Sequence, residues 1–202
     1  MIKTIDYYYS LLSPWTYLGS LRLDVIAQAA GATINYRPVD LGEIFPVSGG
    51  LHLGARAPQR RINRMNELKR WRDFLAMPLT LEPKYFLSAD DEPSTYLVIA
   101  ARESGIDAGP LTNAILRAVW VEERNVGDRH TLQEICADVG LDGSALLARS
   151  EQADIPEIYA ADTREAIERN VFGAPTDIFD GELFWGQDRL DFLERAVNRE
   201  SS

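Results

Sequence analysis

Ser13 is the first residue whose type and position could support chemistry, because it stands directly before Pro14 at the end of a strand-like stretch. Serine is a favoured N-cap and proline suits the first helical turn, so a helix is expected to begin here. A helix N-terminus carries unpaired N–H groups and a positive dipole end, which stabilise an anion. Neither Ser13 nor Thr16 is a thiol, which disfavours disulfide exchange by this stretch itself. The Ser13 hydroxyl either donates a hydrogen bond to a thiolate on a bound ligand or serves only as an N-cap.

A second candidate lies at Gly173-Ala174-Pro175, just before a predicted hairpin. The peptide bond before Pro175 is either trans, in a tight turn, or cis, since the trans form of an Xaa-Pro bond is favoured by only about 0.5–1 kcal/mol. In the cis form, and facing the first helix, the backbone of Ala174 would be free to pair with an extended peptide.

The third candidate is the run from Gly186 to Arg189. Asp188 either caps the last helix or accepts a hydrogen bond from an α-amino group of a ligand. Backbone N–H groups in the same run, including that of Gln187, would then hold an α-carboxylate. Those two charges belong to a γ-glutamyl end.

Two further groups of residues have both a functional and an ordinary interpretation. The basic residues between Arg56 and Arg72 would steer an anionic substrate or hold a carboxylate, or else form a solvated helix face. Aromatic residues at the first strand-to-helix junction would line a pocket for a planar ring or pack in the core; these are Tyr7, Tyr8, Tyr9, Trp15 and Tyr17.

The elements that position these candidates are predicted at the two ends of the chain. β-Branched and aromatic residues predict strands over 4–9 and 33–37. A helix is predicted between them, from Ser13 to Gly31, with Leu18, Leu21 and Val25 on one face. The three elements form a right-handed βαβ unit. Near the C-terminus, residues 176–185 predict a hairpin whose Asp180-Gly181 turn is of type I′. A last helix, capped by Asp188, follows.

The residues in between predict helices and an irregular loop over 48–58. A long helix with an apolar face from Ile62 to Leu75 is ended by Pro78. Further helices are predicted to begin near Pro93, Pro110 and Pro156, and at a capping box, Thr131–Glu134. The fold class is therefore α/β and thioredoxin-like (βαβ … ββα) with an inserted all-helical domain. We place the thioredoxin-like domain at residues 1–42 and 168–202, and the helical domain at 43–167.

Composition excludes several classes of function. The net charge of −10 argues against nucleic acid as a partner, and two histidines are too few for a metal site. A single cysteine, Cys136, excludes an internal disulfide and is expected to be buried. No apolar run is long enough to span a bilayer, so no membrane is expected. The N-terminal residues do not resemble a secretion signal, and a cytoplasmic location is expected.

Taken together, the motifs resemble those of the 2-hydroxychromene-2-carboxylate isomerase family, which is close to kappa-class glutathione transferases, and the similarity covers essentially the whole chain. One departure is the loop at Ser48–Leu53, which lacks the asparagine that many relatives carry near the active site, so the substrate pocket is expected to differ. The matching stretches are Ser13–Gly19, Arg37–Gly42, Glu67–Arg72 with Pro78-Leu79, Gly173–Thr176 and Leu183–Leu190.

The resemblance implies a DsbA-like fold, glutathione as the cofactor and a homodimer. It also implies that Ser13 bonds the glutathione sulfur, that Ala174, before Pro175, pairs with the cysteinyl backbone, and that Asp188, beside Gln187, takes the γ-glutamyl amine. Arg60 falls near a basic residue that relatives use at the cofactor.

The implied activity is glutathione-dependent isomerisation of a small unsaturated, aromatic-derived 2-oxo acid by reversible thiolate addition. The alternatives are a kappa-like glutathione transferase or peroxidase acting on electrophiles, and a glutathione-binding module without turnover.

Overall fold

The fold is built on a four-stranded mixed sheet with strand order β2-β1-β3-β4. The computed structural model describes residues 3–86 and 90–199. β1 runs parallel to β2, whereas β3 is antiparallel to both β1 and β4. In this register Tyr7 of β1 lies between Tyr36 and Asp177. The strands are β1 (Lys3–Tyr9), β2 (Ala32–Pro38), β3 (Thr176–Phe179) and β4 (Glu182–Trp185).

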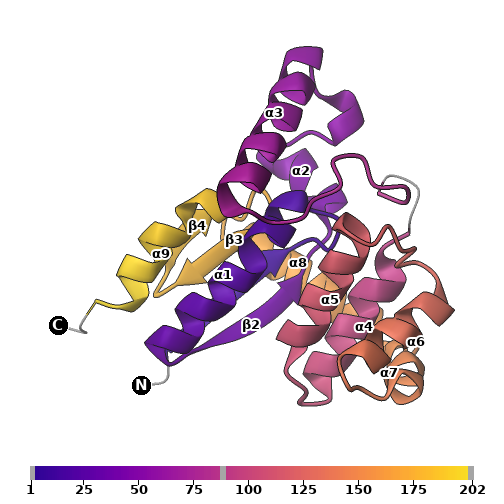
Figure 1. Ribbon diagram of the computed structural model, residues 1–202. Helices are drawn as coiled ribbons and strands as arrows, with labels where there is room; N and C mark the ends of the chain where they lie inside the picture. Colours follow the sequence, from indigo (N-terminus) through magenta and orange to yellow (C-terminus); the bar gives the residue numbers. More distant parts are fainter. Residues whose placement is uncertain (1–2, 87–89, 200–202) are drawn as a thin grey trace.

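Helices cover both faces of this sheet, because the strands bury side chains on both sides. Helices α1 (Pro14–Ala30) and α9 (Leu190–Val197) lie on one face, and α8 (Asp154–Glu168) lies on the other (Figure 1). Tyr7 faces α1 and joins the main core, whereas the neighbouring Tyr8 packs on the α8 side with Ile178. This alternation follows the period of two of a strand.

Between β2 and β3, the regular structure of the described residues is helical, as predicted. The N-terminal end of α3 projects from the rest of the molecule, while α4 to α7 gather on the side of β2 (Figure 1). The bounds are α2 (Leu41–Ser48), η1 (Leu53–Ala55), α3 (Pro58–Leu75), α4 (Glu92–Glu103), α5 (Ala108–Trp120), α6 (Arg129–Asp138) and α7 (Gly143–Ser150), followed by α8.

A buried carboxylate joins two of these helices to the sheet. Asp162 of α8 is only 4% exposed and accepts hydrogen bonds from Arg37 of β2 and Arg102 of α4, each at 2.7 Å. Arg102 also donates to the Tyr36 carbonyl oxygen at 2.9 Å. Each charge is therefore compensated, and α4 and α8 are held against the edge strand β2.

The element order βαβ, helices, ββα confirms the thioredoxin-like fold class. The hairpin turn is also as predicted, since Asp180 and Gly181 have φ of 50° and 80°, the two positive values that type I′ requires. Cys136 is fully buried. No helix in the described ranges has the length and apolarity needed to cross a membrane. The domain boundaries at residues 42 and 168 stay a prediction.

The predicted helix caps were wrong at two places. Helix α6 is capped by Asp128, whose carboxylate accepts the Thr131 N–H at 2.8 Å, so Thr131 lies inside the helix and does not open a capping box. Asp128 binds this N–H as the charged form, which is the stronger acceptor. Asp188 does not cap α9, because a short 3₁₀ turn, η2 (Gln187–Arg189), precedes that helix.

Two predicted apolar helix faces were wrong, and two helices were missed. Leu21 and Val25 on α1 are 54% and 65% exposed, because the buried side of α1 turns toward Leu18, Leu23 and Ile26 instead. Ile62 on α3 is likewise exposed, since this helix packs along its C-terminal half, around Leu68. Helices α2 and α7 were not predicted; α2 contains Pro46, which normally breaks a helix.

Candidate active site

The junction between β1 and α1 holds Ser13 at the N-cap position. Its Oγ accepts the Thr16 N–H at 3.2 Å and donates to the carbonyl oxygen of Ala174 at 3.4 Å. The second bond is near the upper limit for a hydrogen bond, so the hydroxyl proton is weakly held and can turn toward a better acceptor. Ser13 therefore caps the helix and retains a donor for a ligand.

Facing Ser13 is the loop that leads into β3. The peptide bond between Ala174 and Pro175 is cis, which decides between the two alternatives left by the sequence. The Pro175 carbonyl oxygen accepts the Gly186 N–H at 2.9 Å, and this bond ties the loop to the end of the hairpin. A Cβ on Gly173 would lie 2.6 Å from the indole nitrogen of Trp185, so glycine is what allows Trp185 to cover this loop.

The run after β4 brings Gln187 and Asp188 to the same place. Gln187 is buried, and its side-chain and main-chain oxygens accept hydrogen bonds from Arg22 at 3.0 and 3.1 Å. A Cβ on Gly19 would lie 2.8 Å from the Gln187 Cβ, so a glycine in α1 permits this close approach. Asp188 remains partly exposed, and its carboxylate is paired with Arg189 at 2.8 Å.

These three segments line one large cavity of about 1080 Å³. Five of the six residues proposed from the sequence line it, and the sixth, Pro175, fixes the loop that carries Ala174. The cavity extends from Ser13 to helix α3, which forms one of its walls. The main lining residues are Ser13, Trp15, Asp40, Phe45, His52, Arg56, Arg60, Asn63, Arg64, Glu67, Trp71, Phe86, Asp91, Tyr159, Ala174, Trp185, Gln187 and Asp188.

The wall formed by α3 is basic. Arg60, Asn63, Arg64 and Trp71 follow helical spacing, which places them on one side of α3. Arg56 precedes the helix and donates its Nε–H to the Leu51 carbonyl oxygen at 2.8 Å. Burial, and then the neighbouring Arg56, lowers the pKa of Arg64 to about 10. This wall is suited to an anionic group.

The aromatic residues near the junction divide between core and cavity. Tyr7, Tyr8, Tyr9 and Tyr17 are buried and serve packing; the rings of Tyr7 and Tyr9 stack at 4.7 Å. Trp15 alone of the predicted group lines the cavity. The ordinary interpretation therefore holds for the tyrosines.

Several lining residues were missed by the sequence reasoning. Asn63 and Trp71 could have been found from their helical spacing to Arg60. Asp91 had no such signal, because it stands in the acidic stretch Asp90–Glu92, where nothing in the sequence distinguishes one carboxylate from the next. Burial, followed by the charges of neighbouring carboxylates, raises the pKa of Asp91 to about 6. His52, which falls in the predicted loop over 48–58, lines the cavity and packs edge to face on Phe45, with ring centroids 5.3 Å apart.

The fold and the site define a thioredoxin-like protein in which Ser13 stands where a reactive thiol would stand in a redox member. The model of the DSBA-like thioredoxin domain matches residues 4–198. A 2-hydroxychromene-2-carboxylate isomerase from Sphingobium xenophagum is 34% identical over 196 residues, which cover 96% of this chain and 97% of the relative. The chain belongs to the 2-hydroxychromene-2-carboxylate isomerase family, within the DsbA-like thioredoxin proteins.

Two further similarities agree with this assignment. The solved structure of a 2-hydroxychromene-2-carboxylate isomerase matches with a TM-score of 0.82 and 29% identity, covering 97% of this chain and 95% of that one. Glutathione S-transferase kappa 1 from Caenorhabditis elegans is 24% identical over 214 residues, covering 95% of this chain and 89% of the relative. The relatives thus support an enzyme of the isomerase type.

Proposed function

We propose that this protein is a glutathione-dependent isomerase of a small unsaturated, aromatic-derived 2-oxo acid of the 2-hydroxychromene-2-carboxylate type. The observation that carries the proposal is the weakly held Ser13 hydroxyl at the N-terminus of α1, in the wall of a large cavity. Neither Ser13 nor Thr16 is a thiol, and burial raises the pKa of Cys136 to about 11. The reactive sulfur must therefore come from a ligand.

The residues around Ser13 suit a γ-glutamyl tripeptide. Ala174, Gln187 and Asp188 line the same cavity as Ser13. In this proposal the Ala174 backbone pairs with the cysteinyl residue, the Asp188 carboxylate takes the α-amino group, and the η2 backbone at Gln187 holds the α-carboxylate. Arg60 supplies positive charge for a carboxylate on the opposite wall. When bound, glutathione would supply a thiolate that adds reversibly to a conjugated carbon of the substrate.

The role of Ser13 follows from electrostatics. A cysteine thiol has an ordinary pKa of about 8.5, so most of it is protonated at neutral pH. The Ser13 hydroxyl and the N–H groups of α1 stabilise negative charge on the sulfur and lower this pKa. The apolar lining from Trp15, Trp71 and Phe86 offers contact to a planar ring.

The decisive experiment is product analysis with 2-hydroxychromene-2-carboxylate in the presence and absence of glutathione. We expect conversion only with glutathione, a product of unchanged mass, and no consumption of glutathione. Equal conversion without glutathione, or none with it, would contradict the proposal. Loss of glutathione into an adduct would instead support the second candidate, a transferase, which the similarity to the kappa 1 protein favours. Tight binding of glutathione without turnover of any electrophile would indicate a binding module.

Asp188→Asn should weaken glutathione binding about 10-fold, because the amide loses the charge that pairs with the α-amino group. Calorimetry with the parent and the variant measures this change. Asp191→Asn is the matched control, since that carboxylate lies outside the cavity and pairs with Arg22. Equal affinity of the parent and Asp188→Asn would remove Asp188 from the site.

The cytoplasmic location and the homodimer stay predictions.

A further inference from the structure

Arg64 is a cation in the cavity wall that pairs with no carboxylate in the part of the chain that the structure describes. Within residues 3–86 and 90–199, no carboxylate oxygen lies within 4.0 Å of its guanidinium. Among the described residues, the Arg64 side chain makes one hydrogen bond, from Nη1 to the sulfur of Met65 at 3.9 Å, and a thioether is a weak acceptor. By contrast, Arg37 and Arg102 on the sheet side both bind Asp162.

The surroundings of Arg64 make this missing partner costly. Arg64 is partly buried, and burial together with the nearby Arg56 lowers its pKa. A charge withdrawn from water without a counterion raises the free energy of the folded protein. Glu67 lies one turn along α3, but its carboxylate is paired with Arg70. An anion entering the cavity would therefore find a cation that no carboxylate of the described residues neutralises.

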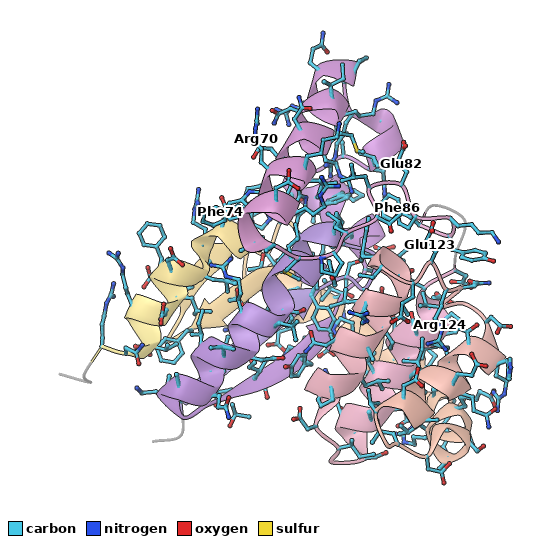
Figure 2. The ribbon with its side chains drawn as sticks, viewed as in Figure 1. Arg70, Phe74, Glu82, Phe86, Glu123 and Arg124 are labelled. Atoms are coloured by element: carbon cyan, nitrogen blue, oxygen red, sulfur yellow. The ribbon has the colours of Figure 1, made fainter. Side chains whose placement is uncertain are left out.

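An aromatic platform lies beside this cation. The Arg64 guanidinium carbon is 5.6 Å from the centroid of the Phe86 ring, within the range of a cation–π contact. Phe86 packs on the buried Trp120, with ring centroids 4.8 Å apart, so its position is fixed by the core. Figure 2 shows Phe86 and Phe74 on opposite sides of α3. Phe74 is exposed and does not line the cavity. Trp71, two turns after Arg64, lines the same cavity.

We infer that Arg64, held against Phe86, binds the carboxylate of the small aromatic substrate, while the substrate ring contacts Phe86 and Trp71. This inference rests on the proposed function for the identity of the substrate, and it deepens that function by naming the specificity-determining residue. Charge and ring are recognised by neighbouring side chains, so the site selects planar carboxylates over neutral rings of the same shape.

The test compares Arg64→Met with Arg61→Met. Methionine keeps the apolar length of the side chain and removes the charge, and Arg61 is exposed on the same helix outside the cavity. We expect Arg64→Met to raise the KM for 2-hydroxychromene-2-carboxylate about 30-fold, with kcat changed little and the Kd for glutathione unchanged. Arg61→Met should match the parent, and Arg64→Lys should recover part of the loss.

Binding of trans-cinnamate and of neutral cinnamamide, followed by tryptophan fluorescence, tests the same residue without turnover. Arg64→Met should weaken cinnamate about 10-fold or more and leave cinnamamide unchanged. Equal weakening of both probes would assign Arg64 a packing role, and weaker binding of glutathione would assign Arg64 to the cofactor. Either result overturns the inference. A parent protein that binds no cinnamate also overturns it. If the parent binds cinnamate through Arg64 but fails to isomerise, the proposed function fails and the carboxylate site stands.

Discussion

Ser13→Ala is expected to lower kcat/KM for glutathione-dependent isomerisation by about 100-fold, with the thiolate of bound glutathione forming at a higher pH. The variant removes the Ser13 hydroxyl, a side-chain donor at the helix N-terminus, and the loss of a donor to a localised negative charge costs about this much in other enzymes. The measurements are steady-state kinetics across pH and the ultraviolet absorbance of the bound thiolate. Ser13→Ala activity within a few-fold of the parent would remove Ser13 from the mechanism.

A structural contribution must be separated from this effect, because Ser13 also caps α1. Loss of an N-cap costs about 1 kcal/mol, which thermal unfolding will show as a modest fall in Tm. Ser13→Asp keeps a capping oxygen and adds negative charge beside the sulfur, so it should be stable and still inactive. Ser10→Ala is the matched control; Ser10 also lines the cavity, and its Oγ accepts the Leu12 N–H at 3.3 Å.

The second large effect concerns the buried carboxyl of Asp177. This residue lies in β3 between Tyr7 of β1 and Phe184 of β4, and it is 1% exposed. Its Oδ1 has no hydrogen-bond partner among the described residues. Burial raises the pKa of Asp177 to about 8, so the folded protein holds this carboxyl in its neutral form at pH 7.

The sign of the pH dependence follows from linkage. In the unfolded chain the carboxyl ionises near pH 4, whereas in the folded protein it keeps its proton until about pH 8. Between these values the folded state binds more protons, so the free energy of unfolding falls as pH rises. The contribution of Asp177 is fully present below pH 4 and is lost as pH passes through 8, a change on the order of 5 kcal/mol.

Asp177→Asn should therefore be more stable than the parent at pH 9, and the difference should shrink as the pH falls toward 5. Asparagine has nearly the same shape and cannot ionise. Urea unfolding of both proteins across this range provides the measurement. Asp180→Asn, on the exposed hairpin turn, is the control and should show no such dependence. A parent whose stability rises from pH 5 to 9 in parallel with that of Asp177→Asn would show that Asp177 is ionised in the folded state.

Local signals in the sequence were sufficient for the ends of the fold and for the Ser13 end of the site. Ser13-Pro14 predicted the start of α1, and Asp180-Gly181 predicted the hairpin turn, because caps and turns depend on a few neighbouring residues. The same reasoning failed where two local preferences competed. Asp128 took the cap expected at Thr131, and α2 formed around Pro46 although proline disfavours a helix interior.

The sequence by itself determined which residues have the chemistry to act: a hydroxyl at a helix N-terminus, a proline before a strand, a carboxylate after the hairpin and a basic segment. Only the tertiary structure decided which of them share a cavity, which arginine of the basic segment lies on an aromatic ring in the cavity wall, and which carboxyl is buried. Spacing along the chain fixes neighbours within a helix or strand. The residues around Arg64, Asp162 and Asp177 come from segments distant in sequence. The burial that shifts the pKa values of Arg64 and Asp177 exists only after those segments pack together.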